Sequence, residues 1–117
     1  MTINLVGELP TLNQYINAER TNRFMAAKMK KDAEKDLLWQ LKAYKFRLEG
    51  KYRFHFTWYR KNSRTDPDNI CAARKFVMDS LVKSGVLLDD KWKHVKGFSD
   101  EFEVSNDTGI KIEIVEV

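Results

Sequence analysis

The segment from Lys51 to Arg60, K-Y-R-F-H-F-T-W-Y-R, constrains the fold more than any other part of this chain. Large aromatic side chains alternate with polar ones along it, which is the period of a β-strand with one buried face. No polar residue interrupts the aromatic row, so we interpret it as core rather than as a platform for stacking bases. The chain must therefore build a sheet whose aromatic face is covered. The predicted inward residues are Tyr52, Phe54, Phe56 and Trp58, and the outward ones are Arg53, His55, Thr57 and Tyr59.

Three further segments have strand character. Residues 2–8 alternate in polarity, residues 92–104 form a less regular strand, and the end of the chain, I-K-I-E-I-V-E-V, alternates strictly. Turn-forming residues at 105–109 separate the last two segments, which we expect to form a closing hairpin. The residues predicted to point inward are Ile3 and Leu5 on the first segment and Ile110, Ile112 and Ile114 on the last.

Two helices are predicted. The first spans about Thr21 to Arg47, because apolar residues recur there every three or four positions, and Gly50 is expected to stop it. Its other face carries many lysines partly offset by acidic residues, which is typical of a solvated face. The second helix covers roughly residues 68–81, and the polar stretch 12–23 is interpreted as a loop that leads into the first helix. The apolar face of the first helix consists of Ala26, Met29, Ala33, Leu37, Leu41, Tyr44 and Leu48.

The predicted element order is therefore β-α-β-α-β-β. Alternating strands and helices are compatible with a doubly wound sheet. The closing hairpin and the length of 117 residues instead favour an α+β fold, with a small mixed sheet and two helices packed on it. No linker or repeat divides the chain, so we expect residues 1–117 to form a single domain.

Composition and charge narrow the class of protein. The single cysteine, Cys71, allows neither an intrachain disulfide nor a zinc-type cysteine pair. Because no apolar run could cross a membrane and the N-terminus lacks the regions of a signal peptide, we expect a cytoplasmic protein without a membrane partner. Residues 1–65 carry 14 Lys and Arg against 6 Asp and Glu, and residues 66–117 carry 7 against 11. This asymmetry suits a protein that grips phosphates beside a metal pocket, and equally suits a solvated basic helix beside an ordinary acidic region.

Acidic residues are concentrated between Arg64 and Asp90. Asp66 and Asp68 flank a proline at the predicted start of the second helix. Neighbouring carboxylates raise each other's pKa unless a cation neutralises them. Two interpretations remain open: Asp68 caps a helix whose dipole favours negative charge there, or the two aspartates bind a divalent metal.

The helix that follows places its charged residues on one stripe. At about 100° per residue, Asp68, Ala72, Lys75 and Asp79 fall close together. Lys75 and Asp79 either form an ion pair or present a partly buried lysine to a phosphate beside metal-binding carboxylates. The opposite, apolar face consists of Ile70, Ala73, Val77 and Leu81, with Cys71, Phe76 and Met78 on its flanks.

Asp89 and Asp90 follow this helix. Taken alone they are a surface turn. Brought back near Asp66 and Asp68 they would complete an all-oxygen site, and such ligands suit Mg²⁺ or, as a substitute, Mn²⁺.

The combined pattern R-x-D-x-D-N, a helix with a lysine and D-x-L, and then G-x-x-x-D-D resembles the RusA family of Holliday junction resolvases. These are small Mg²⁺-dependent endonucleases, mostly encoded by phages and prophages. The resemblance covers nearly the whole chain and includes P-x-x-N-x-Y at Pro10, Asn13 and Tyr15. It implies a RusA-like α+β domain, a homodimer, and a location in a bacterial cytosol.

The resemblance also implies roles for the acidic residues. Asp66 and Asp68 match the paired catalytic, metal-binding aspartates, and Asp90 matches the third. Asp79 matches the helix aspartate that precedes a leucine, and Asp89 is a further candidate for the site.

The lysine departs from the family pattern. The family's lysine lies one turn after the second aspartate, where this chain has Ala72. Lys75 keeps the four-residue distance to Asp79, so the role of catalytic lysine is assigned to Lys75.

Such an enzyme would hydrolyse phosphodiesters with a carboxylate-held Mg²⁺ that activates water and a lysine that stabilises negative charge. Resolving a four-way junction requires two symmetric nicks, and a two-fold homodimer supplies the two sites. We expect polar and basic residues to grip the branched DNA. These residues are Asn13, Arg20, Arg23, Lys28 and Arg64.

Two other functions remain open. The shifted lysine is compatible with a branched-DNA-binding protein of the same fold that does not cut. The third function is a metal phosphohydrolase acting on small phosphate esters, although the chain has no Gly-rich phosphate loop.

Overall fold

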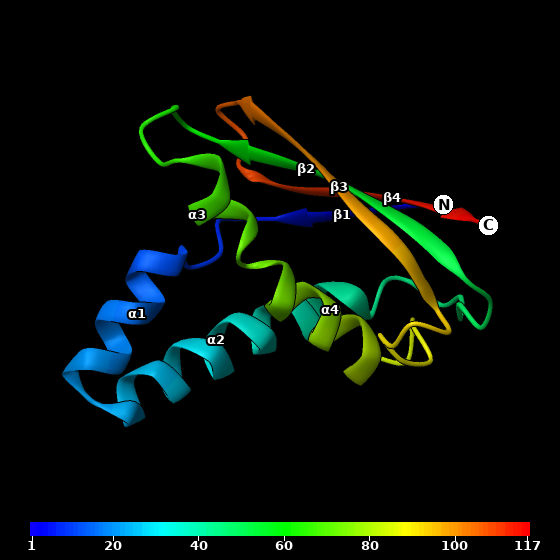
Figure 1. The fold of residues 1–117 in the computed structure, drawn as a ribbon, viewed down its shortest axis with the longest axis horizontal. Coiled ribbons are helices and arrows are strands. Elements are labelled where there is room, and N and C mark those ends of the chain that lie inside the picture. Colours follow the sequence, from blue (N-terminus) through cyan, green and yellow to red (C-terminus); the bar gives the residue numbers. More distant parts are fainter.

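The computed structural model describes residues 1–117 and contains one four-stranded sheet with helices packed on one face (Figure 1). The strand order is β1-β4-β2-β3. β4 pairs antiparallel with both β1 and β2, whereas β2 pairs parallel with β3. The predicted α+β class with a small mixed sheet is confirmed. The elements are β1 (Thr2–Val6), α1 (Leu12–Thr21), α2 (Arg23–Leu41), β2 (Tyr52–Arg60), α3 (Pro67–Cys71), α4 (Arg74–Lys83), β3 (Val95–Val104) and β4 (Gly109–Glu116).

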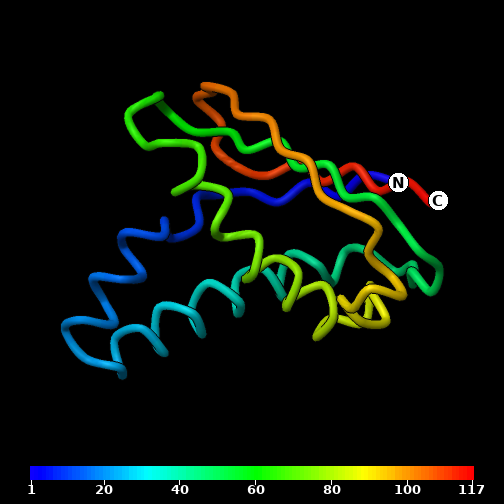
Figure 2. Tube along the Cα trace, viewed as in Figure 1, coloured from blue at the N-terminus to red at the C-terminus, as the bar shows by residue number.

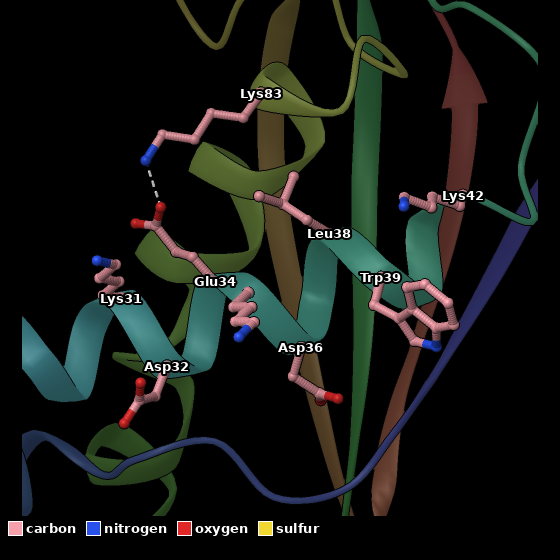
Figure 3. A pocket seen from close by; sticks show the side chains of 9 residues that line it. Lys31, Asp32, Glu34, Asp36, Leu38, Trp39, Lys42 and Lys83 are labelled. Carbon is pink, nitrogen blue, oxygen red and sulfur yellow. Dashed lines mark hydrogen bonds and ion pairs between the residues drawn. The ribbon is translucent and has the colours of Figure 1, made fainter.

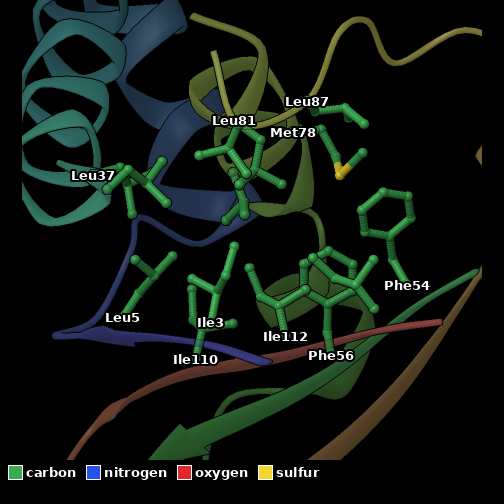
Figure 4. Packing of buried hydrophobic residues seen from close by; sticks show 14 of the residues in the cluster. Ile3, Leu5, Leu37, Phe54, Phe56, Met78, Leu81, Leu87, Ile110 and Ile112 are labelled. Carbon is green, nitrogen blue, oxygen red and sulfur yellow. The ribbon is translucent and has the colours of Figure 1, made fainter. Parts of the chain in front are cut away.

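The core lies between the sheet and the helices, and side chains from both layers fill it (Figure 4). The aromatic row of β2 is buried as predicted, together with the inward isoleucines of β4 and with Ile3 and Leu5 of β1. The helices contribute Leu37 and Leu41 from α2 and Leu81 from α4. Each large apolar side chain buried in this way stabilises the fold by roughly 1.5–3 kcal/mol, which holds the helices on the sheet.

The predicted closing hairpin is wrong, because β3 and β4 do not pair. β4 lies between β1 and β2, and β3 forms the sheet edge. The inward side chains of β4 are buried and suit a central strand, whereas β3 is only half-buried at best and tolerates the edge. The parallel pairing of β2 with β3 needs a crossover connection, which α3 and α4 provide. The chain then crosses the end of β2, where the Ser105 N–H donates to the Arg60 carbonyl at 2.8 Å.

Helix α1 occupies residues that were predicted to be a loop. A capping box starts it: the Thr11 hydroxyl accepts from the Gln14 N–H at 3.2 Å, and the Gln14 side chain accepts from the Thr11 N–H at 2.9 Å. Only Ala18 within the helix is fully buried, so the apolar period is weak. The element order is consequently β-α-α-β-α-α-β-β.

Helix α2 ends at Leu41, earlier than the predicted end at Arg47, so Gly50 is not its stop. The chain leaves the helix because Leu48 pairs with the segment after α4. The Leu48 N–H donates to the Val86 carbonyl at 2.6 Å, and the Leu48 side chain is completely buried.

The two chain ends lie together at the end of the sheet away from α3 (Figures 1 and 2). The Met1 ammonium donates to the Ile114 carbonyl at 3.0 Å, and the Val117 N–H donates to the Lys51 carbonyl at 2.9 Å. None of the helices combines the length and the apolar character needed to cross a membrane.

Candidate functional site

The aspartate pair lies at the start of α3. Asp66 is the N-cap residue, and its carbonyl accepts from the Asn69 and Ile70 N–H groups at 3.1 and 3.2 Å. Pro67 fills the first helical position, where a missing N–H costs nothing. The Asp66 side chain makes no capping hydrogen bond, and the Asp66 and Asp68 side chains are both exposed. The helix therefore does not use either carboxylate as a cap, and the N-cap is Asp66 rather than Asp68.

Asn69 joins α3 to the start of α1. Its Oδ1 accepts a hydrogen bond from the Asn13 N–H at 2.8 Å. A second contact supports the first: the rings of Tyr15 and Phe76 meet edge to face, with centroids 5.8 Å apart. The D-P-D-N segment and the P-x-x-N-x-Y segment, which are distant in sequence, are thus packed against each other. Sequence reasoning gave Asn69 no role and assigned Asn13 only to DNA contact.

The predicted second helix is interrupted. α3 ends before Ala72 and α4 begins after Ala73, whose ψ of −8° departs from the helical value. The Ala73 N–H donates to the Ile70 carbonyl at 3.2 Å. This bond spans three residues, as in a 3₁₀ turn, and not four as in an α-helix. Ile70 and Ala73 are nevertheless both buried as predicted. The stripe that runs from Asp68 through Ala72 is therefore not continuous with the α4 part of the site.

Lys75 and Asp79 form an ion pair within α4, with 3.0 Å between Nζ and Oδ1. Lys75 is not partly buried as predicted, since its side chain is 70% exposed, whereas that of Asp79 is 19% exposed. Lys30 of α2 lies 3.8 Å from the other Asp79 oxygen. The hydrogen bond to Asp79 and the Asp79 charge raise the pKa of Lys75, and the charges of Asp90 and Glu34 add to this effect.

Asp89 and Asp90 have different surroundings. The Asp89 side chain accepts from the Lys91 N–H at 2.9 Å and lies 3.8 Å from Nε2 of the buried His94. Asp89 therefore stabilises the turn after α4. Asp90 is exposed, and its influence on Lys75 indicates that its charge acts on the α4 side of the molecule.

The carboxylates do not form a closed metal cage. No group of three or more His, Cys, Asp and Glu side chains is arranged to hold a metal, so Asp66, Asp68 and Asp90 are not gathered into one site. The open Asp66–Asp68 pair fits a different requirement. Mg²⁺ commonly takes one or two protein carboxylates and completes its shell with waters and substrate phosphate oxygens.

A cavity of about 330 Å³ lies where α1 begins and α3 meets α4. The two lysines that touch Asp79, Lys30 and Lys75, are the charged residues of its wall. Positive charge thus faces a concave space between the two segments that Asn69 joins. The wall consists of Pro10, Thr11, Leu12, Tyr15, Lys30, Ala72, Ala73, Lys75 and Phe76.

The predicted DNA-binding residues flank α1 at both ends. Arg20 and Arg23 are exposed around the turn between α1 and α2, far from the sheet (Figure 1). The Arg23 guanidinium lies 5.5 Å from the centroid of the Phe24 ring. Lys28 is less available, because it pairs with Asp32 at 2.8 Å.

Arg64 lies in the loop between β2 and α3. It is exposed and two residues from Asp66. Asn13 is exposed at the first turn of α1, where the hydrogen bond to Asn69 holds its backbone. Arg64, Asn13 and the aspartate pair are therefore the predicted residues that the structure brings to one end of the molecule.

A second ion pair fixes α4 on the sheet. Both terminal nitrogens of Arg74 donate to Oδ2 of Asp100 on β3, at 3.1 and 2.9 Å, and Nε1 of Trp58 donates to Oδ1 at 2.8 Å. The guanidinium also lies 4.7 Å from the centroid of the Phe98 ring. This cluster sets the direction in which the chain resumes after the break. No sequence signal identifies it, because it depends on the pairing of β3 with β2.

The chain matches no known protein-family model, and a search of curated proteins finds no relative.

Proposed function

We propose that this protein is a Mg²⁺-dependent endodeoxyribonuclease that resolves four-way junctions and related branched DNA by paired nicks. The observation that supports this best is the contact between Asn13 and Asn69. It packs the two motifs of the family resemblance against each other, and the second motif carries two exposed carboxylates of which Asp66, the N-cap residue, makes no capping hydrogen bond.

The candidate aspartates and Lys75 have different roles in this enzyme. Asp66 and Asp68 would hold Mg²⁺ and leave positions for phosphate oxygens of the DNA, whereas Asp90, which is not gathered with them, would become the third carboxylate only in the DNA complex. When bound, the ion polarises the phosphodiester and lowers the pKa of water. Lys75, held by Asp79, carries positive charge toward the phosphate.

The substrate contacts and the assembly follow from the same proposal. Arg64 and Asn13 contact the DNA backbone near the aspartates, and Arg20, Arg23 and Lys28 contact an arm further along α1 and α2. Two nicks on opposing strands require two sites, so the active form is a two-fold homodimer. The family resemblance, which is to enzymes encoded mostly by phages and prophages, supports a location in the bacterial cytosol.

The test is nicking of a synthetic four-way junction in the presence of Mg²⁺. Wild type should introduce paired nicks, and Asp68→Asn should lose nicking while it still binds the junction. Asp107→Asn is the matched control, since it removes one exposed carboxylate from the loop between β3 and β4. If wild type binds the junction but does not nick it in either Mg²⁺ or Mn²⁺, the protein is not a junction-resolving nuclease.

The second candidate is a branched-DNA-binding protein that does not cut. Two observations favour it: the three candidate carboxylates are not gathered, and Lys75 is exposed and neutralised by Asp79. The junction assay separates the two candidates, because a binding protein would shift the junction without any product appearing. Activity on small phosphate esters without DNA would favour the phosphohydrolase instead.

A further inference from the structure

A groove of about 830 Å³ runs along the outer face of α2, beside the end of α4 (Figure 3). Lysines and one tryptophan dominate its wall. Lys31, Lys35, Trp39 and Lys42 are spaced by four, four and three residues along α2. At about 100° per residue these positions fall within a sector of roughly 80°, so they form one stripe. The groove wall consists of Lys31, Asp32, Glu34, Lys35, Asp36, Leu38, Trp39, Lys42 and Lys83.

The acidic residues of the groove are already engaged. Asp32 pairs with Lys28 at 2.8 Å, and Glu34 is bound by Lys83, as the dashed line in Figure 3 shows. Asp36 accepts a hydrogen bond from the Gln40 amide at 2.9 Å. The groove wall still carries four lysines against three acidic residues, so a small excess of positive charge remains.

The lysines of the stripe are uncommitted. Lys31, Lys35 and Lys42 take part in no ion pair, whereas Lys28, Lys30, Lys75, Lys83 and Lys111 all do. Lys42 lies over the indole of Trp39, 4.8 Å from the ring centroid. The Trp39 side chain is 71% exposed. Two lysines without an ion pair, a third over the ring and an exposed tryptophan on one stripe match the chemistry that binds a nucleic-acid strand, whose phosphates need charge and whose bases stack.

The groove and the cavity at the α3–α4 break are lined by neighbouring residues of α2. Lys30 lines the cavity and its neighbour Lys31 lines the groove. Glu34 lies between the two spaces, 3.8 Å from Lys30 and bound to Lys83. From Lys31 to Lys42 the stripe is about 16 Å long, which corresponds to about five stacked nucleotides at roughly 3.4 Å each.

We propose that this groove binds a single-stranded DNA segment, with phosphates on Lys31, Lys35 and Lys42 and an unpaired base stacked on Trp39. Branched DNA, the substrate of the proposed function, exposes unpaired nucleotides where its arms open, so the groove deepens that function and rests on it. The site holds the flank of the substrate and takes no part in hydrolysis.

The test measures binding of a fluorescently labelled oligothymidylate by anisotropy, with the full chain. Trp39→Ala should raise Kd about tenfold, within the range found when a stacking aromatic is removed. Trp92→Ala is the matched control: Trp92 is 91% exposed but lies outside the groove, so Kd should change less than twofold. Quenching of tryptophan fluorescence by the oligonucleotide should likewise persist in Trp92→Phe and disappear in Trp39→Phe.

The lysines have a charge-matched control. Replacing Lys31, Lys35 and Lys42 together by Ala should reduce the slope of log Kd against log salt by about 2, the value for three single-strand phosphates. Replacing Lys51, Lys93 and Lys96 by Ala changes the net charge equally, and the slope should stay as in wild type; these lysines are exposed and outside the groove.

Several outcomes would overturn the groove. The proposal fails if Trp39→Ala binds oligothymidylate with the Kd of wild type, or if the groove variants and the control variants lose affinity equally. It also fails if Trp39→Ala changes the sedimentation of the protein but not its affinity, because this face would then be a contact between copies of the chain. Its failure is distinguishable from failure of the proposed function. A protein that never nicks junctions but binds oligothymidylate through Trp39 loses the nuclease and keeps the groove. A protein that nicks junctions, but whose Trp39→Ala variant binds oligothymidylate as wild type does, keeps the nuclease and loses the groove.

Discussion

The Asn13 N–H donates a 2.8 Å hydrogen bond to Oδ1 of Asn69 across 56 positions of sequence. The bond joins the first turn of α1 to the first turn of α3, where the two exposed aspartates lie. It is the only side-chain hydrogen bond between these two helices. One amide side chain therefore ties the start of α1 to the aspartate pair, in addition to the packing of Tyr15 on Phe76.

Asn69→Ala should lower the free energy of unfolding by about 1 kcal/mol, the usual value of one hydrogen bond. Junction binding and nicking should fall further than this loss explains, because α1 carries the predicted DNA contacts. Urea denaturation gives the stability, and hydrogen exchange of the Asn13 amide reports the bond directly. Asn106→Ala, in the exposed loop between β3 and β4, serves as the control.

Asp100→Ala should lower the free energy of unfolding more than Asn69→Ala does. It leaves the Arg74 guanidinium, whose side chain is 20% exposed, and the Trp58 indole N–H without their acceptor. Loss of a half-buried charge pair of this kind costs about 2–3 kcal/mol. The shift of the urea midpoint, at an unchanged m-value, measures this loss of stability. The control Asp107→Ala should stay within about 0.5 kcal/mol of wild type. Equal stability of the two variants would show that the cluster does not anchor α4.

The Lys75–Asp79 pair predicts a dependence on alkaline pH. Asp79 raises the pKa of Lys75 above its ordinary value of 10.5. A raised pKa in the folded state adds stability that is present below the unfolded pKa and is lost as pH rises through the folded pKa. Lys75→Gln should therefore be less stable than wild type at pH 7, and the difference should vanish only well above pH 10.5. Because Lys75 is mostly exposed, the difference should be at most about 0.5 kcal/mol.

The same pKa excludes Lys75 from acting as a base near neutral pH. Lys75 should stay positively charged between pH 7 and 10, so its titration should not change the rate of any step that depends on this charge. Nicking by wild type and by Lys75→Arg should therefore show parallel pH profiles in this window. A decline that Lys75→Arg abolishes would contradict this assignment.

Mg²⁺ should bind wild type through Asp66 and Asp68 independently of catalysis. Excess Mg²⁺ should raise Tm, because a ligand that binds only the folded state stabilises it. The double variant Asp66→Asn/Asp68→Asn should lose this response and retain its stability without metal, since neither carboxylate caps α3. Asp89→Ala is a useful comparison: it removes the acceptor of the Lys91 N–H, so it should lower stability without changing the Mg²⁺ response.

Junction affinity should fall steeply with salt. A grip through six to ten phosphates would lose about 10³–10⁵ in affinity between 50 and 200 mM salt. Electrophoretic mobility shifts over this range give the slope. A flat response would contradict a backbone-dominated contact.

Alternation of side chains was sufficient to predict β1, β2 and β4, because one face of each strand is buried and Ile3, Phe56 and Ile112 mark that face. α1 was missed because its polar surface hides the period, although Thr11 and Gln14 formed a recognisable capping box. The order of strands was not predictable from neighbours in sequence, since β4 inserts beside β2 and displaces β3 to the edge.

The candidate site was predictable only in its residue types. The break at Ala72 and Ala73 falls on the strongest helix-forming residue, so local preference argued against it. Packing of Ala73 into the core and the Arg74–Asp100 pair override that preference. Exposure of the Lys75 side chain depends on the same break.

The meeting of the chain ends has a practical consequence for engineering. Because the Met1 ammonium is bonded to the Ile114 carbonyl, a short peptide linker can join the two termini without disturbing the sheet. New ends can then be opened in the exposed loop at residues 106–107, between β3 and β4. Such a circular permutant would place α2 closer to the middle of the chain, and it would leave both ends available for tethering a second copy in a single polypeptide.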